Sequence, residues 1–195
     1  MKKLLLLPLI SINLLAAAQN TLIPDANFEQ ALINLGYDNV IDGGLLTANI
    51  SGLTTVSVNA QNISDLTGIE DFTALTSLDC GGNQLTSLDV SQNSALIGLY
   101  CNDNALTNLD VSQNTALNYL SCSVNQLTSL DVSQNTALTY LDCYNNQLTN
   151  LDVTQNTALD WLDCYNNQFT NIDITQNNAL EWLDCYNNQL TNLDV

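Results

Sequence analysis

The sequence predicts a single-domain repeat solenoid, a curved right-handed coil of mostly parallel β-strands with few helices and an N-terminal helical cap. The first observation is the spacing of the six cysteines, each 21 residues from the next: Cys80, Cys101, Cys122, Cys143, Cys164 and Cys185. The second is that leucines, asparagines and aspartates recur around them in the same register. One such unit cannot bury its apolar face alone, whereas stacked units form a continuous core.

The repeat domain, 53–195, contains one looser unit of 22 residues, five units of 21 residues and a last, incomplete unit. Because Val195 ends that unit part-way, we expect either a fragment of a longer protein or a truncated reading frame. The preceding segment, 19–52, is predicted to form an N-terminal cap.

The spacing inside a unit predicts which side chains face the core. Leu75, Leu78 and Cys80 are spaced as on a short strand whose alternate residues point inward. Asn83 then turns the chain, because its side chain can bond backbone groups of a turn. Leu85 begins the same pattern on the return side. The cysteines should therefore form a buried column of thiols without disulfides, since parallel in-register side chains do not point at one another.

The cap contains one predicted helix, Asp25 to Leu35. Asp25 is a typical N-cap residue, apolar residues follow at helical spacing, and Gly36 ends the pattern. We expect this helix to cover the open edge of the first coil, as capping segments of solenoids do. The loop 38–43 lacks the alternating ligands of a calcium-binding loop and is interpreted as a turn.

The pattern L-x-x-L-x-C-x-x-N-x-L, followed by x-x-L-D-V-x-x-N, resembles the leucine-rich-repeat family. Within that family it is similar to the 21-residue class with nested half-repeats, the IRREKO type, and 63–69 resembles internalin repeats. The cap resembles the N-terminal segment of secreted repeat proteins from Bacteroidota, particularly flavobacteria. The resemblance implies a curved solenoid of parallel strands that recognises a protein or a glycan.

The first 18 residues have the pattern of a secretory signal peptide. Lys2 and Lys3 precede an apolar stretch from Leu4 to Leu15, and an A-x-A site ends at Ala18. The apolar stretch is shorter than the ~20 residues that cross a bilayer. We therefore expect export to the cell surface, the extracellular space or the periplasm, without membrane insertion.

The composition argues against catalysis and against nucleic-acid binding. The only basic residues are Lys2 and Lys3 and there is no histidine, so loss of 1–18 moves the formal charge from −18 to −20. Nucleic acids are bound through Lys and Arg, so we expect no nucleic-acid partner. Nucleophile–histidine pairs, Schiff-base lysines and histidine metal sites are likewise ruled out. We expect no enzyme and no cofactor.

One column of aspartates runs through the units: Asp89, Asp110, Asp131, Asp152, Asp173 and Asp194. Like charges about 5 Å apart repel by roughly 0.8 kcal/mol in water and about 3 kcal/mol at an effective dielectric of 20. The column should therefore be exposed and bonded by turn N–H groups two residues on. Calcium bridging between coils is the alternative, not favoured because the glycine-rich nonapeptide calcium repeat is missing.

The aromatic residues gather in columns on one side of the first strand of each unit. The first column holds Tyr119, Tyr140, Trp161 and Trp182; the second holds Asp142, Asp163 and Asp184; the third holds Tyr144, Tyr165 and Tyr186. We expect all of them to face the concave surface. Aromatic faces stack on sugar rings or anchor a protein partner, and carboxylates accept hydrogen bonds, so these are the predicted ligand-binding residues.

Two interpretations of these columns remain open. In the first, the chain is a non-enzymatic binding module that recognises a protein or glycan through its concave face. In the second, it is a structural spacer or adhesion stalk of a larger surface protein, and the aromatic ladders serve stability alone. Paired carboxylates also stand near the separation of a retaining glycosidase. We expect their environments to be identical, however, which gives no reason for one to hold a proton.

Overall fold

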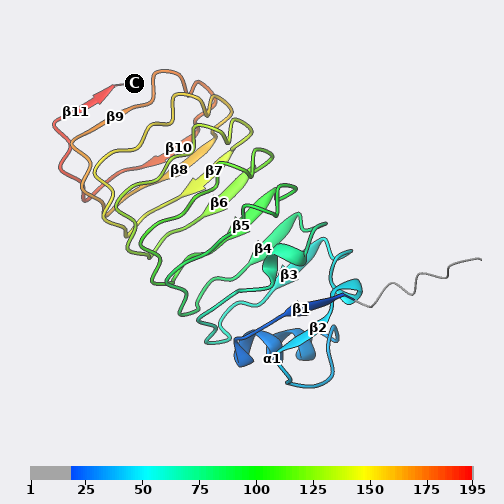
Figure 1. Ribbon diagram of the computed structural model, residues 1–195. Helices are drawn as coiled ribbons and strands as arrows, with labels where there is room; N and C mark the ends of the chain where they lie inside the picture. The colour runs from blue at the N-terminus through cyan, green and yellow to red at the C-terminus, as the bar shows by residue number, and fades with distance from the viewer. Residues whose placement is uncertain (1–18, 195) are drawn as a thin grey trace, which may run out of the picture.

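The computed structural model describes residues 19–194, so the predicted signal peptide, 1–18, lies outside the described residues. Figure 1 shows coils stacked one on the next, with the cap at one end and the C-terminal coil at the other. Among the described residues, no helix has the length and apolar character needed to cross a membrane.

A seven-stranded parallel sheet runs along the stack, with one short strand from each coil. In spatial order the strands are β3 (Thr55–Ser57), β4 (Ser77–Asp79), β5 (Gly98–Tyr100), β6 (Tyr119–Ser121), β7 (Tyr140–Asp142), β8 (Trp161–Asp163) and β10 (Trp182–Asp184). Neighbours pair in register, so that Leu120 of β6 lies between Leu99 and Leu141. This arrangement confirms the predicted solenoid of parallel strands.

The return side of each coil completes the core with the second half of the repeat. Leu85 and Val90 are fully buried there, as the spacing predicted. In the last coils this side forms a two-stranded parallel sheet of β9 (Asn171–Asp173) and β11 (Asn192–Asp194), whereas the first coil has the short 3-10 helix η2 (Ile69–Asp71).

The cysteines form the predicted internal column. All six are free; Cys185, in the last coil, is half-buried and the other five are buried. Burial raises the pKa of Cys80 to about 12, with a smaller contribution from the charge of Asp79. Because the thiolate is the reactive form, a thiol with so high a pKa is inert at neutral pH. The column therefore acts as part of the apolar core.

Asparagines fasten each turn to the neighbouring coil. Asn125 shows the pattern: its Nδ2 donates to the carbonyl oxygens of Cys101 (3.0 Å) and Cys122 (3.1 Å), and its Oδ1 accepts from the Leu106 N–H (2.9 Å). The same position is occupied by Asn83, Asn104, Asn146, Asn167 and Asn188. A second buried column on the other turn donates to carbonyls of the preceding coil: Asn93, Asn114, Asn135, Asn156 and Asn177.

The cap consists of the helix α1 (Ala26–Asn34), the antiparallel pair β1 (Asn20–Leu22) and β2 (Gly44–Leu46), and the 3-10 helix η1 (Thr47–Asn49). As predicted, Asp25 caps α1, where Oδ1 accepts from the Asn27 and Phe28 N–H groups. Its Oδ2 accepts from Ser64, which ties the helix to the first coil. Burial raises the pKa of Asp25, but these hydrogen bonds outweigh it and hold the pKa below its usual value.

The helix ends where the glycine predicted it. Gly36 has a φ of +84°, and the next residue, Tyr37, donates its N–H back to the Leu32 carbonyl. The following loop is the predicted turn, and Glu29 of α1 organises it. The Glu29 Oε1 is buried and accepts from three successive N–H groups, those of residues 42–44, at 2.8–3.0 Å.

One turn position of every coil has left-handed backbone, and Val124 occupies it in one of them. Its φ is +53°, where later coils have Asn145 and Asn166. A β-branched residue is strained in this region, which asparagine tolerates. We expect Val124→Asn to raise the free energy of unfolding by about 1 kcal/mol, measured by urea denaturation. The converse change, Asn145→Val, should lower it by a similar amount. A less stable Val124→Asn variant would show that packing of the valine outweighs its backbone strain.

Candidate functional site

The predicted site residues lie on one face of the seven-stranded sheet. The central apolar residue of each strand points toward the core, and Leu120, Leu141 and Leu162 have no exposed surface there. Since alternate side chains of a strand point to opposite faces, the residues before and after each leucine point away from the core. We call this side of the sheet, together with the side chain two positions after each strand, the strand face.

Two aromatic ladders run along the strand face, and their rings are stacked. In the first, ring centroids are 4.1 Å apart for Tyr119–Tyr140, 5.7 Å for Tyr140–Trp161 and 4.6 Å for Trp161–Trp182, with planes within 14° of parallel. In the second, they are 4.5 Å for Tyr144–Tyr165 and 4.6 Å for Tyr165–Tyr186. The structure therefore brings the predicted aromatic columns together as continuous stacks.

The first ladder has one member that the sequence reasoning did not assign to it. Tyr100 stands in the aspartate column by sequence position, yet its ring centroid lies 4.7 Å from that of Tyr119. The ladder position of its own coil is Gly98, and a Cβ there would lie 3.3 Å from the Tyr100 ring. Tyr100 thus occupies the space that a side chain at Gly98 would fill. A glycine in the ladder register two residues before a tyrosine is the signal that could have revealed it.

Stacking decides which part of each ring is available to a ligand. A ring with parallel neighbours on both sides has its faces covered, so Tyr140, Trp161 and Tyr165 present edges and polar atoms outward. The end members, Trp182 and Tyr186, are 48% and 55% exposed. Stacked aromatic pairs contribute about 0.5–1.5 kcal/mol each beyond burial. The ladders therefore stabilise the solenoid, whatever else they do.

The carboxylates between the ladders differ in the donors that the preceding coil supplies. Asp79 accepts from Ser57 Oγ (3.0 Å) and Asn59 Nδ2 (2.7 Å) of the coil before it. Asp142 likewise accepts from two hydroxyls of the coil before it, those of Ser121 (2.8 Å) and Ser123 (2.9 Å), both on Oδ2. In both coils the carboxylate thus accepts hydrogen bonds from two side chains of the preceding coil, one at the same repeat position and one two residues later.

Asp163 has no such pair of serines, because the coil before it carries Asp142 and Tyr144 at those positions. Its Oδ1 is buried without a hydrogen-bond partner among the described residues, and so is Oδ1 of Asp142. Burial, followed by the charges of Asp142 and Asp184, raises the pKa of Asp163 to about 6. Burial also raises the pKa of Asp142, although the two serine hydroxyls oppose it.

These differences correct one expectation from the sequence. The carboxylates of the column were predicted to have identical environments, and they do not, because donors come from the preceding coil and vary from coil to coil. Asp142 is 8% exposed, whereas Asp163 and Asp184 are half-buried. Adjacent carboxylates on strands about 5 Å apart repel by about 3 kcal/mol at an effective dielectric of 20. The column from Asp142 to Asp184 is therefore a strongly negative strip.

The ladders border this strip closely. Burial raises the pKa of the Tyr140 hydroxyl, a hydrogen bond with Tyr119 opposes this, and the charges of Asp142 and Asp163 raise the pKa further. The Trp161 Nε1 of the first ladder is buried and has no hydrogen-bond partner among the described residues. The strip and its aromatic borders thus hold several polar atoms that the described part of the fold leaves unpaired.

The second aspartate column has the predicted turn geometry. Asp131 Oδ1 accepts from the Ser133 N–H at 2.9 Å, and Asp173 Oδ1 accepts from the Thr175 N–H at 2.9 Å. These backbone bonds, with help from the hydroxyls, hold the pKa of both carboxyls below the usual value. Over residues 19–194, no three His, Cys, Asp or Glu side chains converge in a way that could hold a metal ion.

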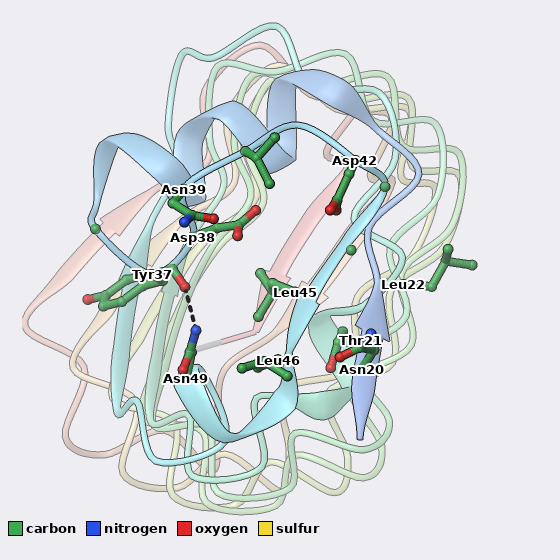
Figure 2. A pocket seen from close by; sticks show the side chains of 14 residues that line it. Asn20, Thr21, Leu22, Tyr37, Asp38, Asn39, Asp42, Leu45, Leu46 and Asn49 are labelled. Carbon is green, nitrogen blue, oxygen red and sulfur yellow. Dashed lines mark hydrogen bonds between the residues drawn. The ribbon is translucent and has the colours of Figure 1, made fainter. Parts of the chain in front are cut away.

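A separate hollow of about 890 Å³ lies at the cap. Figure 2 shows its lining from β1, β2 and the loop after α1, with the hydrogen bond from Asn49 Nδ2 to the Tyr37 carbonyl at 3.1 Å. Its rim includes the exposed side chains of Leu22 and Leu46. Sequence reasoning missed this hollow, because it arises from how the β1–β2 pair and the loop after α1 meet. None of the predicted site residues lines it.

Comparison with known proteins agrees with this architecture, although no family model matches the chain. A 75-residue stretch, 38% of the chain, is 44% identical to internalin J of Listeria monocytogenes serotype 4b (strain F2365), of which it spans 8%. The solved functional domain of internalin J, described as including a cysteine ladder, is 35% identical over 92% of the chain, which spans 50% of that domain (TM-score 0.62). The chain is a leucine-rich-repeat protein.

Further leucine-rich-repeat structures resemble it. One of Leptospira interrogans is 33% identical over 67% of this chain and 36% of its own (TM-score 0.63). The ectodomain of a plant membrane receptor kinase from Arabidopsis thaliana, solved in complex with CASPARIAN STRIP INTEGRITY FACTOR 2, shares the fold alone, at 22% identity (TM-score 0.68). This leucine-rich-repeat protein thus spans half or less of each of these relatives.

Proposed function

We propose that the chain is a non-enzymatic binding module, secreted or at the cell surface, that recognises a protein through the concave, strand-bearing face of its solenoid. Leucine-rich-repeat folds of the internalin kind commonly bind proteins. The observation that carries the proposal is the column of carboxylates between two aromatic ladders whose end rings, Trp182 and Tyr186, are exposed. Aromatic side chains exposed beside charged groups on an ordered surface are characteristic of a contact site.

A protein partner fits this surface better than a glycan does. Recognition of a sugar by stacking needs an open aromatic face, and the inner rings of both ladders are covered by their neighbours. Edges and hydroxyls, by contrast, suit the hydrogen bonds and side-chain contacts of a protein interface. The exposed rings of Trp182 and Tyr186 at the end of the ladders would supply the apolar part of the contact.

The structural spacer is the second candidate, and the stacking itself supports it. To distinguish the two, the purified protein is titrated with a panel of extracellular glycoproteins, their deglycosylated forms and the released glycans, with tryptophan fluorescence as the signal. We expect saturable binding to a deglycosylated polypeptide. The double change Trp182→Ala and Tyr186→Ala should weaken this binding at least tenfold, because these two exposed rings supply the apolar part of the contact. Both side chains end their ladders, so their loss leaves the inner rings in place.

Leu22→Ala is the matched control, since Leu22 is 65% exposed and lies on the cap, away from the ladders. It should leave binding unchanged. If the double variant melts at a lower temperature while no member of the panel binds even the native protein, the spacer is favoured. Binding of released glycans alone would favour glycan recognition.

A further inference from the structure

We propose that Gln19 becomes the first residue of the exported chain and that its side chain closes onto its own α-amino group to form an N-terminal pyroglutamate. This inference rests on the secreted part of the proposed function, because removal of 1–18 is what frees the α-amino group of Gln19. The modification site is the single residue between the predicted signal peptide and the strand β1.

The folded cap begins at this residue. The Gln19 carbonyl accepts a hydrogen bond from the Thr47 N–H (2.9 Å), which extends the pairing of β1 with β2 by one residue. Two residues further on, Thr21 is buried and donates its hydroxyl to Asp71 Oδ2 (2.6 Å). A cut at the A-x-A site, after Ala18, leaves these contacts in place, whereas a cut beyond β1 would remove them. The fold and the cleavage pattern therefore favour the same boundary.

The side chain of Gln19 is free to react. It is exposed and makes no hydrogen bond with any other residue that the structure describes. After the cut, the α-amino nitrogen attacks the side-chain amide carbon, Cδ. The bond between that nitrogen and Cδ forms, the Cδ–Nε2 bond breaks, and Nε2 leaves as ammonia with a proton from the α-amine. No oxidant, reductant or further reactant is needed, and an α-amino group with a pKa of about 8 is partly unprotonated at neutral pH.

The product fits the beginning of the strand. Ring closure ties the backbone nitrogen to the side chain as in proline, and proline is tolerated as the first residue of a strand. The backbone carbonyl of Gln19 lies outside the new ring, so it can keep its hydrogen bond from the Thr47 N–H. The cap therefore needs no rearrangement to accept the modified residue.

Cyclisation removes the last primary amine of the exported chain. The only basic side chains are those of Lys2 and Lys3, both within 1–18, and there is no histidine. The α-amino group of Gln19 is therefore the one group left after cleavage that can carry a positive charge. Aminopeptidases need a free α-amino group, so the lactam protects β1 from removal residue by residue. Since β1 pairs with β2 in the cap, the modification preserves the covered end of the solenoid.

The test uses the full chain, produced in a bacterial host that exports it. The exported protein is analysed by intact mass spectrometry and, after denaturation, by labelling with an amine-reactive succinimidyl ester dye. We expect the mass of residues 19–195 less one ammonia, and no incorporated dye. Gln19→Asn is the matched control, because its side chain is one methylene shorter and closure would require a strained four-membered ring. This variant should keep its amine, show the full mass and take one dye per chain.

A native chain of residues 19–195 that has its full mass and takes one dye would overturn the cyclisation. An exported chain that begins at any other residue would overturn the assignment of Gln19. A chain that keeps 1–18 would contradict both this inference and the export on which the proposed function depends. Binding is tested separately with the glycoprotein panel: if no member binds the blocked chain, the binding module fails and the pyroglutamate stands.

Discussion

Replacing Asn125 with aspartate is expected to lower the free energy of unfolding by about 3 to 5 kcal/mol. The amide donates to the Cys101 and Cys122 carbonyls and accepts from the Leu106 N–H, which joins two coils at a buried turn. An aspartate keeps the acceptor oxygen, but its second carboxylate oxygen takes the place of the amide nitrogen and faces the carbonyl oxygens of Cys101 and Cys122. It also brings a negative charge into a buried site that has no cation. Urea unfolding followed by circular dichroism should show the midpoint falling sharply, with the melting temperature lower by about 10 °C.

Asn108→Asp is the control for Asn125→Asp. Asn108 is exposed on the neighbouring coil, so the same change of an amide to a carboxylate meets water there. It should alter the free energy of unfolding by less than about 0.5 kcal/mol. A loss as large at Asn108 as at Asn125 would show that added negative charge, rather than the buried amide ladder, controls stability.

The fold was predictable because its determinants are periodic and local. The positions of Leu78, Cys80 and Leu85 follow from how alternate residues of a strand face the core, and burial confirms all three. The turn hydrogen bond of Asp131 joins residues two apart, so a single unit contains all of it. The helix Asp25 to Leu35 likewise depended on a capping aspartate and a terminating glycine that the sequence displays, and its observed extent differs by one residue at each end.

The candidate site was predictable only in outline, because its properties depend on pairs of neighbouring coils. Stacking places the aromatic residues in columns, but the sequence does not say whether ring faces or edges point outward. Tyr100 joins the ladder because Gly98 leaves a space, which requires the three-dimensional distance between them. Asp142 and Asp163 occupy equivalent positions, yet serines precede one and an aspartate and a tyrosine precede the other. An equivalent place in the repeat is therefore no guarantee of an equivalent environment.

Asp163→Asn is expected to stabilise the protein at neutral pH and to remove much of its pH dependence between about 4 and 6. In the folded state burial, then the charges of Asp142 on β7 and Asp184 on β10, raise the Asp163 pKa from 3.8 to about 6, and the Tyr165 N–H only partly opposes this. The folded chain thus binds a proton more tightly than the unfolded chain does. By linkage, the free energy of unfolding falls as the pH rises through this window. Discounted for solvent screening, the loss is about 1 to 2 kcal/mol, or roughly 3 to 6 °C in melting temperature.

The opposite sign applies to the aspartates bonded at turns. The lowered pKa values of Asp25 and Asp131 contribute stability that is present above pH 4 and is lost as the pH falls further. The native protein should therefore melt at its highest temperature near pH 4 to 5, and Asp163→Asn should flatten the decline above that optimum. Asp131→Asn should leave that decline in place, because Asp131 has finished titrating below it. A decline that persists unchanged in Asp163→Asn would assign it to the repulsion of the whole acidic surface rather than to the titration of Asp163.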